Sequence, residues 1–339
     1  SHLGFIRREI PVRQFVGNNF DIILTREYIS IPEIVIRNKI PQEIIFKTLQ
    51  SVPANYGNSP ALLTGFYREG IRKKNEIQTY AEAILQIFKS SYTTSFYNDQ
   101  IKIIKSRKIE NTDVTDTLTV RLKAGLSTSL DLDIIRNGFE FISRGNINDY
   151  TYRITDIVTV DEDAAYVIEF EQKKHIDLPL FKGSVIINTS DFAVLNAVFE
   201  INPAHIDKIR DSFISSPSRE FNTWPTSVRY SVTYRKVDGR YFLSHVRGDL
   251  EFTSKQKRRL FNTQFMVFFE LAVTDVNTGS ISRFEREELA PVHSVFSSTI
   301  TSYDPVFWQG FDFLKPEDDL LEALKDMKVR LSEFSGLPD

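Results

Sequence analysis

The stretch Phe181–Ile201 constrains this chain most, because it has the pattern of two strands joined by a polar turn. Its second half places small and large apolar residues at every second position, namely Ala193, Leu195, Ala197, Phe199 and Ile201. A strand shows this period of two when one face packs on a core or lines a cavity. We therefore predict a β-hairpin whose inner face is either packed or open.

Further strand signals follow the same alternation along the chain. Tyr150–Val160 and Ala165–Glu171 flank an acidic turn, and Val228–Tyr234 is joined to Tyr241–His245 by a turn that contains Asp238 and Gly239. We also predict strands over 250–253, 260–274 and 280–285. The 27 Phe and 13 Tyr residues suit a pleated, half-buried surface. Connections this short join antiparallel strands, so the sequence predicts a long, meandering antiparallel sheet.

Helical patterns are fewer. Pro41–Val52 has a proline in its first turn and apolar residues at helical spacing, and we expect this helix to stop at Pro53. The mixed stretch Gly125–Phe141 suggests a short helix placed inside or against the sheet. A last helix is predicted over Pro316–Leu331, with acidic residues in its first turn and one apolar stripe. Residues 77–92 fit either a helix or a strand.

Size, charge and composition exclude several classes of protein. A chain of 339 residues predicts one large domain plus a smaller piece. The net charge of −3 gives no global attraction to nucleic acid or to an anionic membrane surface. The absence of cysteine excludes disulfides, thiolate metal sites and a cysteine nucleophile. No apolar run approaches the length of a transmembrane helix, and we expect any signal peptide to lie upstream of Ser1.

The first residues contain four short strand-like segments: Ser1–Phe5, Glu9–Val12, Asp21–Leu24 and Ile31–Ile36. These segments resemble the last strands of the carboxypeptidase-regulatory-like domain, a small transthyretin-like β-sandwich found in envelope proteins of Bacteroidota. The likeness covers about a tenth of the chain and lacks the earlier strands of that domain. It implies an incomplete sandwich over 1–37 and a separate main domain over 38–339.

The main domain has four characteristic segments: Leu63–Glu69, Tyr80–Tyr92, the hairpin Phe181–Ile201 and Asp304–Phe311. With these segments it resembles the second β domain of the same class of envelope proteins, which is similar to the periplasmic lipoprotein-carrier fold. The resemblance favours strands over a helix at 77–92. It implies an α+β, β-dominated fold, in which a large curved antiparallel sheet forms an incomplete β-barrel wrapped around helices. It brings no activity with it.

Candidate catalytic and metal-binding residues each have a simpler interpretation. Asp131, Asp133 and Glu140 suggest a calcium loop, but Ile135 and Arg136 stand where that loop needs an oxygen ligand and a glycine. The remaining candidates also have structural explanations: the spaced histidines His175, His205, His245 and His293, the acidic pairs Asp161/Asp163 and Asp318/Asp319, and the aromatic pair Phe307/Trp308. We therefore expect no catalytic residue, metal or cofactor.

The basic segment Lys255–Arg259 is the densest positive cluster. A solvated hairpin tip explains it, and contact with phosphates or lipid headgroups is the alternative.

Three functional hypotheses follow. The first is a non-enzymatic, periplasmic or outer-membrane-associated protein that binds a lipid, a lipidated partner or another hydrophobic ligand on its concave sheet. The candidate contacts are the inner-face residues Leu195, Phe199, Phe170 and Ile168. The second is a structural or interaction module with a filled interior that docks an outer-membrane component, and the third is a hydrolase of envelope glycan. A dry, open apolar groove of several hundred Å³ favours the first hypothesis, whereas an interior filled by side chains would exclude it. The third hypothesis requires a cleft with converging carboxylates and perturbed pKa values.

Overall fold

A computed structural model describes residues 39–110 except 75 and 95, residues 125–213, 220–257 and 261–291, and residue 296. The predicted N-terminal sandwich fragment, the aromatic pair at 307 and 308 and the predicted C-terminal helix therefore lie outside the described residues. The elements are α1 (Pro41–Asn55), β1 (Ala61–Lys73), β2 (Glu76–Lys89), β3 (Gln100–Glu110), α2 (Gly125–Asp131), α3 (Ile134–Asn137), η3 (Glu140–Ile142), η4 (Ile147–Asp149), β4 (Tyr150–Val160), β5 (Asp163–Gln172), β6 (Phe181–Asn188), β7 (Val194–Ile201), η5 (Pro203–Ile209), α4 (Arg210–Phe213), β8 (Phe221–Val237), β9 (Arg240–Gln256), β10 (Asn262–Asn277) and η6 (Arg286–Glu288).

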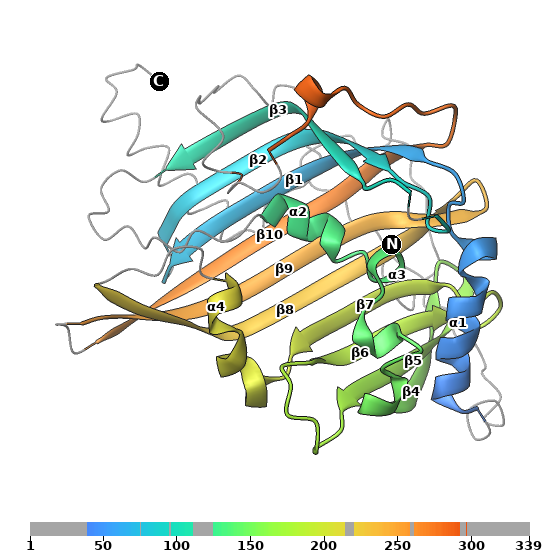
Figure 1. The fold of residues 1–339 in the computed structure, drawn as a ribbon, viewed down its shortest axis with the longest axis horizontal. Coiled ribbons are helices and arrows are strands. Elements are labelled where there is room, and N and C mark those ends of the chain that lie inside the picture. Colours follow the sequence, from blue (N-terminus) through green and yellow to red (C-terminus); the bar gives the residue numbers. More distant parts are fainter. Residues whose placement is uncertain are drawn as a thin grey trace, which may run out of the picture.

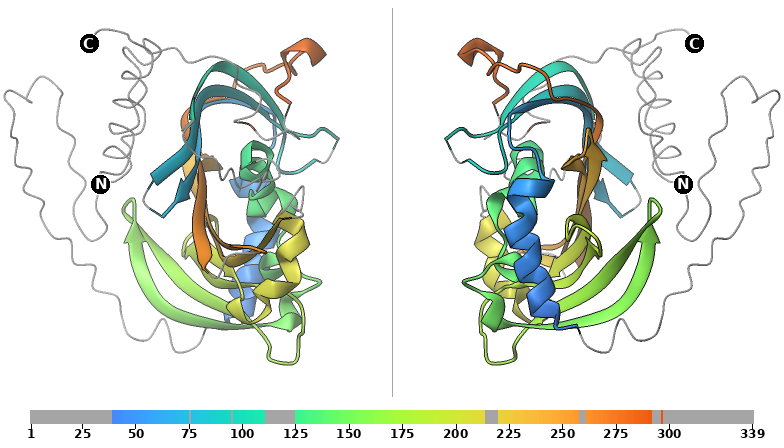
Figure 2. Two further views of the ribbon diagram at one scale, coloured as in Figure 1. Left: turned by 90° about the vertical axis from the view of Figure 1, so that its left-hand side faces the viewer. Right: turned by 90° about the vertical axis from the view of Figure 1, so that its right-hand side faces the viewer.

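The ten strands among the described residues form one antiparallel sheet in the order β3-β2-β1-β10-β9-β8-β7-β6-β5-β4. Strands β4 to β10 follow one another as a meander, and the hairpin β1–β2 with β3 extends the sheet beyond β10. The sheet curves around α1 and α2, which lie on its concave side (Figures 1 and 2). The predicted β-dominated fold with one large antiparallel sheet is confirmed.

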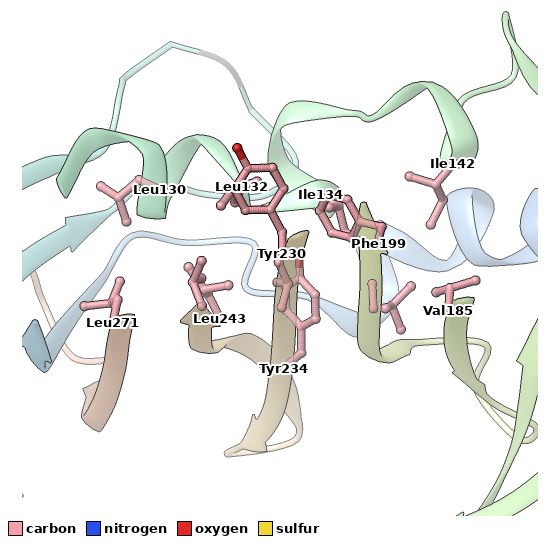
Figure 3. Close-up of a cluster of buried hydrophobic side chains, with 14 of the residues drawn as sticks. Leu130, Leu132, Ile134, Ile142, Val185, Phe199, Tyr230, Tyr234, Leu243 and Leu271 are labelled. Carbon is pink, nitrogen blue, oxygen red and sulfur yellow. The ribbon is translucent and has the colours of Figure 1, made fainter. Parts of the chain in front are cut away.

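The connection from β3 to β4 joins the two edges of the sheet, so it crosses the concave face. Its described part carries α2, α3, η3 and η4 in succession. Figure 3 shows Leu130, Leu132 and Ile134 of this connection above side chains of the sheet that include Leu243, Leu271 and Phe199. These side chains are buried, and they belong to one continuous hydrophobic core. The predicted short helix against the sheet is therefore present as α2 and α3.

The hairpin at Phe181–Ile201 forms as β6 and β7, and its turn is fixed from several sides. Asn188 accepts hydrogen bonds through its side-chain oxygen from the backbone nitrogens of Ser190 (2.8 Å) and Asp191 (3.4 Å). The hydroxyl of Tyr56, at the end of α1, accepts from Val194 N at 2.9 Å and donates to Val194 O at 3.2 Å. The turn is thereby tied to α1, and the inner face of β7 is held toward the core.

Two expectations about element boundaries are wrong. Residues 280–285 form no strand. Instead they approach the start of β3 through a bond from Phe284 N to the Gln100 side chain (3.0 Å), followed by a single backbone bond from Ala290 N to Ile101 O (2.8 Å). Helix α1 also continues through Pro53 to Asn55, because a proline in the last turn removes only one backbone donor.

Side chains on the other face of the sheet form a row of alternating charge. Arg107, Glu82, Arg68, Glu270 and Arg247 lie directly opposite one another on β3, β2, β1, β10 and β9. Arg68 Nε donates to Glu270 Oε2 at 2.6 Å, and both residues are buried. Opposite charges placed across neighbouring strands stabilise a sheet, so this row fixes the register of its centre.

Within the described ranges, no helix has the length and apolar content to cross a bilayer.

Candidate functional site

Three inward-facing positions on neighbouring strands form a gap in the concave face. Phe170 on β5 pairs with Gly183 on β6, which pairs in turn with Phe199 on β7. A Cβ at Gly183 would lie 2.7 Å from the Cα of Phe199 and would collide with the carbonyl oxygen of Val198, so only glycine fits. The two aromatic rings thus flank a position without a side chain. We call Phe170, Gly183 and Phe199 the aromatic notch.

The notch is occupied by Phe141 of η3. The Phe141 ring stacks on Phe170 with centroids 4.1 Å apart and planes 7° from parallel, and its centroid is 5.1 Å from that of Phe199. Phe139 extends the cluster, with ring centroids 5.5 Å from Phe199 and 5.6 Å from Phe181. Aromatic pairs at such distances contribute about 0.5–1.5 kcal/mol beyond the burial of their area. We call residues 139–142 the plug.

The plug is attached to the sheet mainly by apolar packing. Gly138 precedes it with a φ of 68°, a left-handed conformation that suits glycine. Its backbone bonds are local, from Ile142 N to Phe139 O (3.0 Å) and from Ser143 N to Glu140 O. Tyr152 on β4 donates its hydroxyl proton to Phe141 O at 2.9 Å. Phe139 and Phe181 are only partly buried, so the aromatic cluster reaches the protein surface.

All four residues predicted to contact a ligand are buried on the concave face: Ile168, Phe170, Leu195 and Phe199. The structure brings Phe170 and Phe199 together in the notch. On β5, Ile168 is the next inward-facing residue after Phe170, and it lies opposite Val185. Leu195 lies at a β-bulge between the pairs Ile186/Asn196 and Ile187/Val194. Their role in binding stays a prediction.

The sequence reasoning missed Gly183, Phe139 and Phe141. Gly183 carries a sequence signal, because a glycine inside a strand pattern indicates a bulge or a close approach of backbone. Phe139 and Phe141 carry none, since their partners lie on other elements.

A buried cluster of charged residues holds the start of α3, just before the plug, against the sheet. Lys89 at the end of β2 is fully buried, and its Nζ lies 2.6 Å from Asp99 Oδ2 and 2.7 Å from Asp133 Oδ2. Asp133 caps α3 by accepting from Arg136 N, and it also accepts from the hydroxyl of Tyr234 at 2.7 Å. The cluster therefore holds the start of α3 in place while the plug follows after Gly138.

The charges in this cluster stabilise one another. Burial alone would lower the pKa of Lys89, but the charges of Asp133 and Asp99 outweigh burial and raise it. Burial would likewise raise the pKa of Asp99, but Lys89 lowers it through its charge and its hydrogen bond. The calcium-loop interpretation of Asp131, Asp133 and Glu140 has no support here, because Asp133 is committed to Lys89. Among the described residues no group of three or more acidic or histidine side chains is placed to hold a metal.

Two hollows lie at the protein surface. A groove of about 620 Å³ runs over β4 to β8, and its lining includes the three notch residues Phe170, Gly183 and Phe199. Outward side chains also line it, and there Arg153 pairs with Glu169 at 2.6 Å and Lys182 with Glu200 at 3.4 Å. A hollow of about 470 Å³ lies beside the charged cluster and is lined by Asn98, Asp99, Ile101, Ser127, Leu130, Asp131, Arg136 and Asn137. Charged side chains form part of both linings.

Four described carboxylates have pKa values that their surroundings lower: Asp99, Asp177, Glu270 and Glu288. A general acid needs the opposite shift. The acidic turn at Asp161 has a structural role, since Asp161 adopts a φ of 47° and Asp163 accepts a hydrogen bond from Asn188. His245 is likewise bound to Glu270, at 2.7 Å.

Comparison with known proteins gives remote structural likeness only. No family model matches the chain, and no curated protein matches it. A solved DUF1329 family protein from Desulfovibrio piger is similar at 12% identity and a TM-score of 0.31, over 74% of this chain and 98% of that one. A LolA superfamily protein from Nitrosomonas europaea has 13% identity and a TM-score of 0.26, over 71% and 94%. A domain assigned to outer membrane lipoprotein sorting from Vibrio parahaemolyticus has 10% identity and a TM-score of 0.29, over 72% and 96%.

Proposed function

We propose that this protein is a non-enzymatic, periplasmic or outer-membrane-associated protein that binds a lipid, a lipidated partner or another hydrophobic ligand on the concave face. The observation that supports this most is the aromatic notch, which is an apolar slot occupied by the side chain of a short, locally bonded segment. The ligand enters when the plug leaves, and it then contacts Phe170 and Phe199. This is a gated site, because Phe141 of the plug packs against both Phe170 and Phe199 of the notch.

The energy needed to open the notch suits a long apolar chain. Removing Phe141 and Ile142 from the core, and Phe139 from its edge, costs about 2 kcal/mol for each side chain, or roughly 6 kcal/mol together. Each buried methylene of a ligand returns about 0.8 kcal/mol, so roughly eight methylenes offset the opening. Shorter apolar ligands would not displace the plug. An acyl chain of ordinary membrane-lipid length would do so with a surplus.

The test measures binding of a fluorescent long-chain fatty acid to wild-type protein and to Phe141→Ala. Truncation weakens the closed state, so we expect about tenfold tighter binding by the variant, since the apparent affinity rises with the fraction of open molecules. Phe252→Ala is the matched control, because Phe252 is also buried but contacts Phe213 of α4 instead of the notch. Equal gains in both variants, or no binding by any of the three proteins, would contradict the proposal.

The natural ligand is sought by native mass spectrometry of protein made in its own host. A mass increment that lipid extraction removes is expected. If no lipid co-purifies and the fatty acid does not bind, the carrier interpretation should be dropped.

A structural or interaction module is the second candidate, and the filled interior favours it. In that case the charged groove on the outward face of β4 to β8 contacts an envelope component, and the paired charges of Lys182, Glu200 and Arg229 in its lining determine the contact. Reversing one of these charges with Arg229→Glu would then abolish association with that component. The fatty-acid titration of Phe141→Ala would show no gain.

A further inference from the structure

We propose that the outward face of β1, β2 and β10 is the docking surface for this chain's own C-terminal segment, through the amphipathic helix predicted over Pro316–Leu331. The described residues that form this outer patch are Phe66, Arg68, Ile77, Tyr80, Glu82, Phe268 and Glu270. The patch lies on the face of the sheet opposite to the notch. The proposal is therefore independent of ligand binding in the notch and is tested separately.

The first observation is that the outer patch is buried, although it lies on one face of a single sheet. All seven side chains are 5% exposed or less, and the apolar ones do not belong to the hydrophobic core on the concave side. The same face is solvated farther along. Arg229 on β8 lies in the same row as Phe268, through Asp249 on β9, and its side chain is 62% exposed. A sheet face becomes as dry as the patch only under a second layer of structure.

The described elements do not supply this layer. Helices α1, α2 and α4 lie on the concave side of the sheet (Figure 2). The described segment that follows β10 contacts the start of β3, where Ala290 N donates to Ile101 O. The charged row of the patch meets β3 six residues farther on, at Arg107. The cover therefore comes from outside the described residues.

The second observation is where the C-terminal segment begins. Phe296 packs edge-on against Tyr67 of β1, with ring centroids 5.2 Å apart, and Tyr67 lies between two residues of the patch. The 19 residues from 297 to 315 can span up to about 60 Å, enough to pass around the sheet. The N-terminal segment joins the described part elsewhere. Lys39 Nζ lies 5.5 Å from the ring centre of Tyr166 on β5, toward the other edge of the sheet.

The predicted helix matches the patch in pattern and in length. Its apolar stripe holds Leu320, Leu324, Met327 and Leu331 at helical spacing, and such a stripe needs an apolar partner. A helix of 16 residues is about 24 Å long. The patch extends along β1 from Phe66 to the position opposite Ile77, which is about 20 Å. One helix therefore covers the patch.

Charge also favours the C-terminal segment. Arg68 Nη1 is buried and has no hydrogen-bond partner among the described residues, so a cover that brings a carboxylate would satisfy it. Residues 312–322 carry five acidic side chains and one lysine. Residues 1–38 carry five arginines and four acidic side chains, so they offer no excess of carboxylates.

The test uses the full chain, which contains no cysteine, so an introduced thiol reacts alone. Ile77→Cys places the thiol in the outer patch. Ile87→Cys is the matched control, because Ile87 is also buried on β2 but belongs to the concave core. Both should react slowly with a maleimide. Adding Leu324→Asp should raise the rate at Ile77→Cys roughly tenfold or more, since the helix loses the burial of a leucine, and should leave Ile87→Cys unchanged.

A second readout is cross-linking with a bismaleimide. Ala272 is opposite Phe66 on the outward face, so Ala272→Cys with Leu324→Cys should be joined within one chain. Val198→Cys with Leu324→Cys is the control, because Val198 is 39% exposed on the outward face of β7, and it should give no such product.

The proposal is overturned if Ile77→Cys reacts rapidly in the otherwise unchanged chain, or if Leu324→Asp leaves its rate unaltered. A rise caused by Ile34→Asp instead would assign the cover to the N-terminal segment. Protection that weakens on dilution would assign it to a second copy of the chain. If Leu324→Asp makes both cysteines reactive, the cross-link decides, and its absence for Ala272→Cys with Leu324→Cys overturns the proposal.

Discussion

The substitution Glu270→Gln tests the electrostatic contribution of the charged row on β1, β9 and β10. Glu270 is 5% exposed, and its carboxylate lies 2.6 Å from Arg68 Nε and 2.7 Å from His245 Nε2. Burial alone would raise the pKa of Glu270. The hydrogen bond from His245 and the charge of Arg68 outweigh burial and lower the pKa to about 2.

The size and sign of the effect follow from this shift. An unfolded glutamate has a pKa of about 4.3, so the difference of roughly two units corresponds to about 3 kcal/mol of folding stability. Because the folded pKa is the lower one, this stability is fully present above about pH 5. It is lost as the pH falls toward 2. At pH 7 Glu270→Gln should therefore be about 3 kcal/mol less stable than the wild type, and near pH 2 the two proteins should be equally stable.

The assay is urea denaturation followed by circular dichroism at a series of pH values between 7 and 2. The difference between variant and wild type is taken at each pH, so titration of other groups largely cancels. Glu251→Gln is the control, because Glu251 is an exposed carboxylate on the adjacent strand β9. Its effect should stay below about 0.5 kcal/mol throughout. A difference for Glu270→Gln that does not change with pH would refute the reasoning.

Two further substitutions test the surroundings of the notch. Lys89→Met should lower the free energy of unfolding by about 3–5 kcal/mol in urea denaturation, because it leaves the carboxylates of the buried Asp133 and of Asp99 without their cation. If Lys89→Met kept wild-type stability, the charged cluster would not be what holds the start of α3 against the sheet. Gly183→Ala should lower the thermal midpoint, at a cost of about 1–3 kcal/mol, because its Cβ would collide with the backbone of Val198. An unchanged midpoint would show that β6 and β7 can separate freely there.

The strands were predictable where the alternation of side chains coincides with a local turn signal. The hairpin β8–β9 is an example, because Asp238 and Gly239 adopt φ values of 49° and 78°, which their residue types tolerate. The segment 280–285 shows the limit of such patterns. Its two apolar residues, Ile281 and Phe284, are three positions apart and so do not share one face of a strand, and the structure gives it only isolated bonds to the start of β3. Within the described sheet, strand β3 is at the edge and has a free side, so the segment lacked the alternating pattern and not a partner.

The notch was only half predictable for a related reason. Phe170 and Phe199 are identifiable as inner-face residues, since period two in one strand assigns a face. That they flank Gly183 follows only from the register of three strands. The plug comes from a connection that precedes β4 and packs across β5 to β7, so its contacts depend on the topology of the whole sheet. No local pattern contains that information.

A second glycine in the same row of the sheet shows why the notch at Gly183 is the better candidate for binding. Continuing from Phe199, the row passes through Tyr230 to Gly248 and then to Phe269. At Gly248 the gap is covered by the ring of Phe269, which lies on the adjacent strand and would collide with an added Cβ. Covering a strand glycine with a cross-strand aromatic ring is a device that stabilises sheets, and the cover cannot leave while the sheet is intact.

At Gly183 the neighbouring rings leave room for a third, and that ring comes from the plug. Its removal breaks one hydrogen bond from Tyr152 and the apolar packing of a few side chains, but no pairing between strands. The two glycines thus differ in what opening would cost. Opening the gap at Gly248 would disrupt the sheet, whereas opening the notch at Gly183 would displace only the plug, at an energy that the acyl chain of the proposed function would offset.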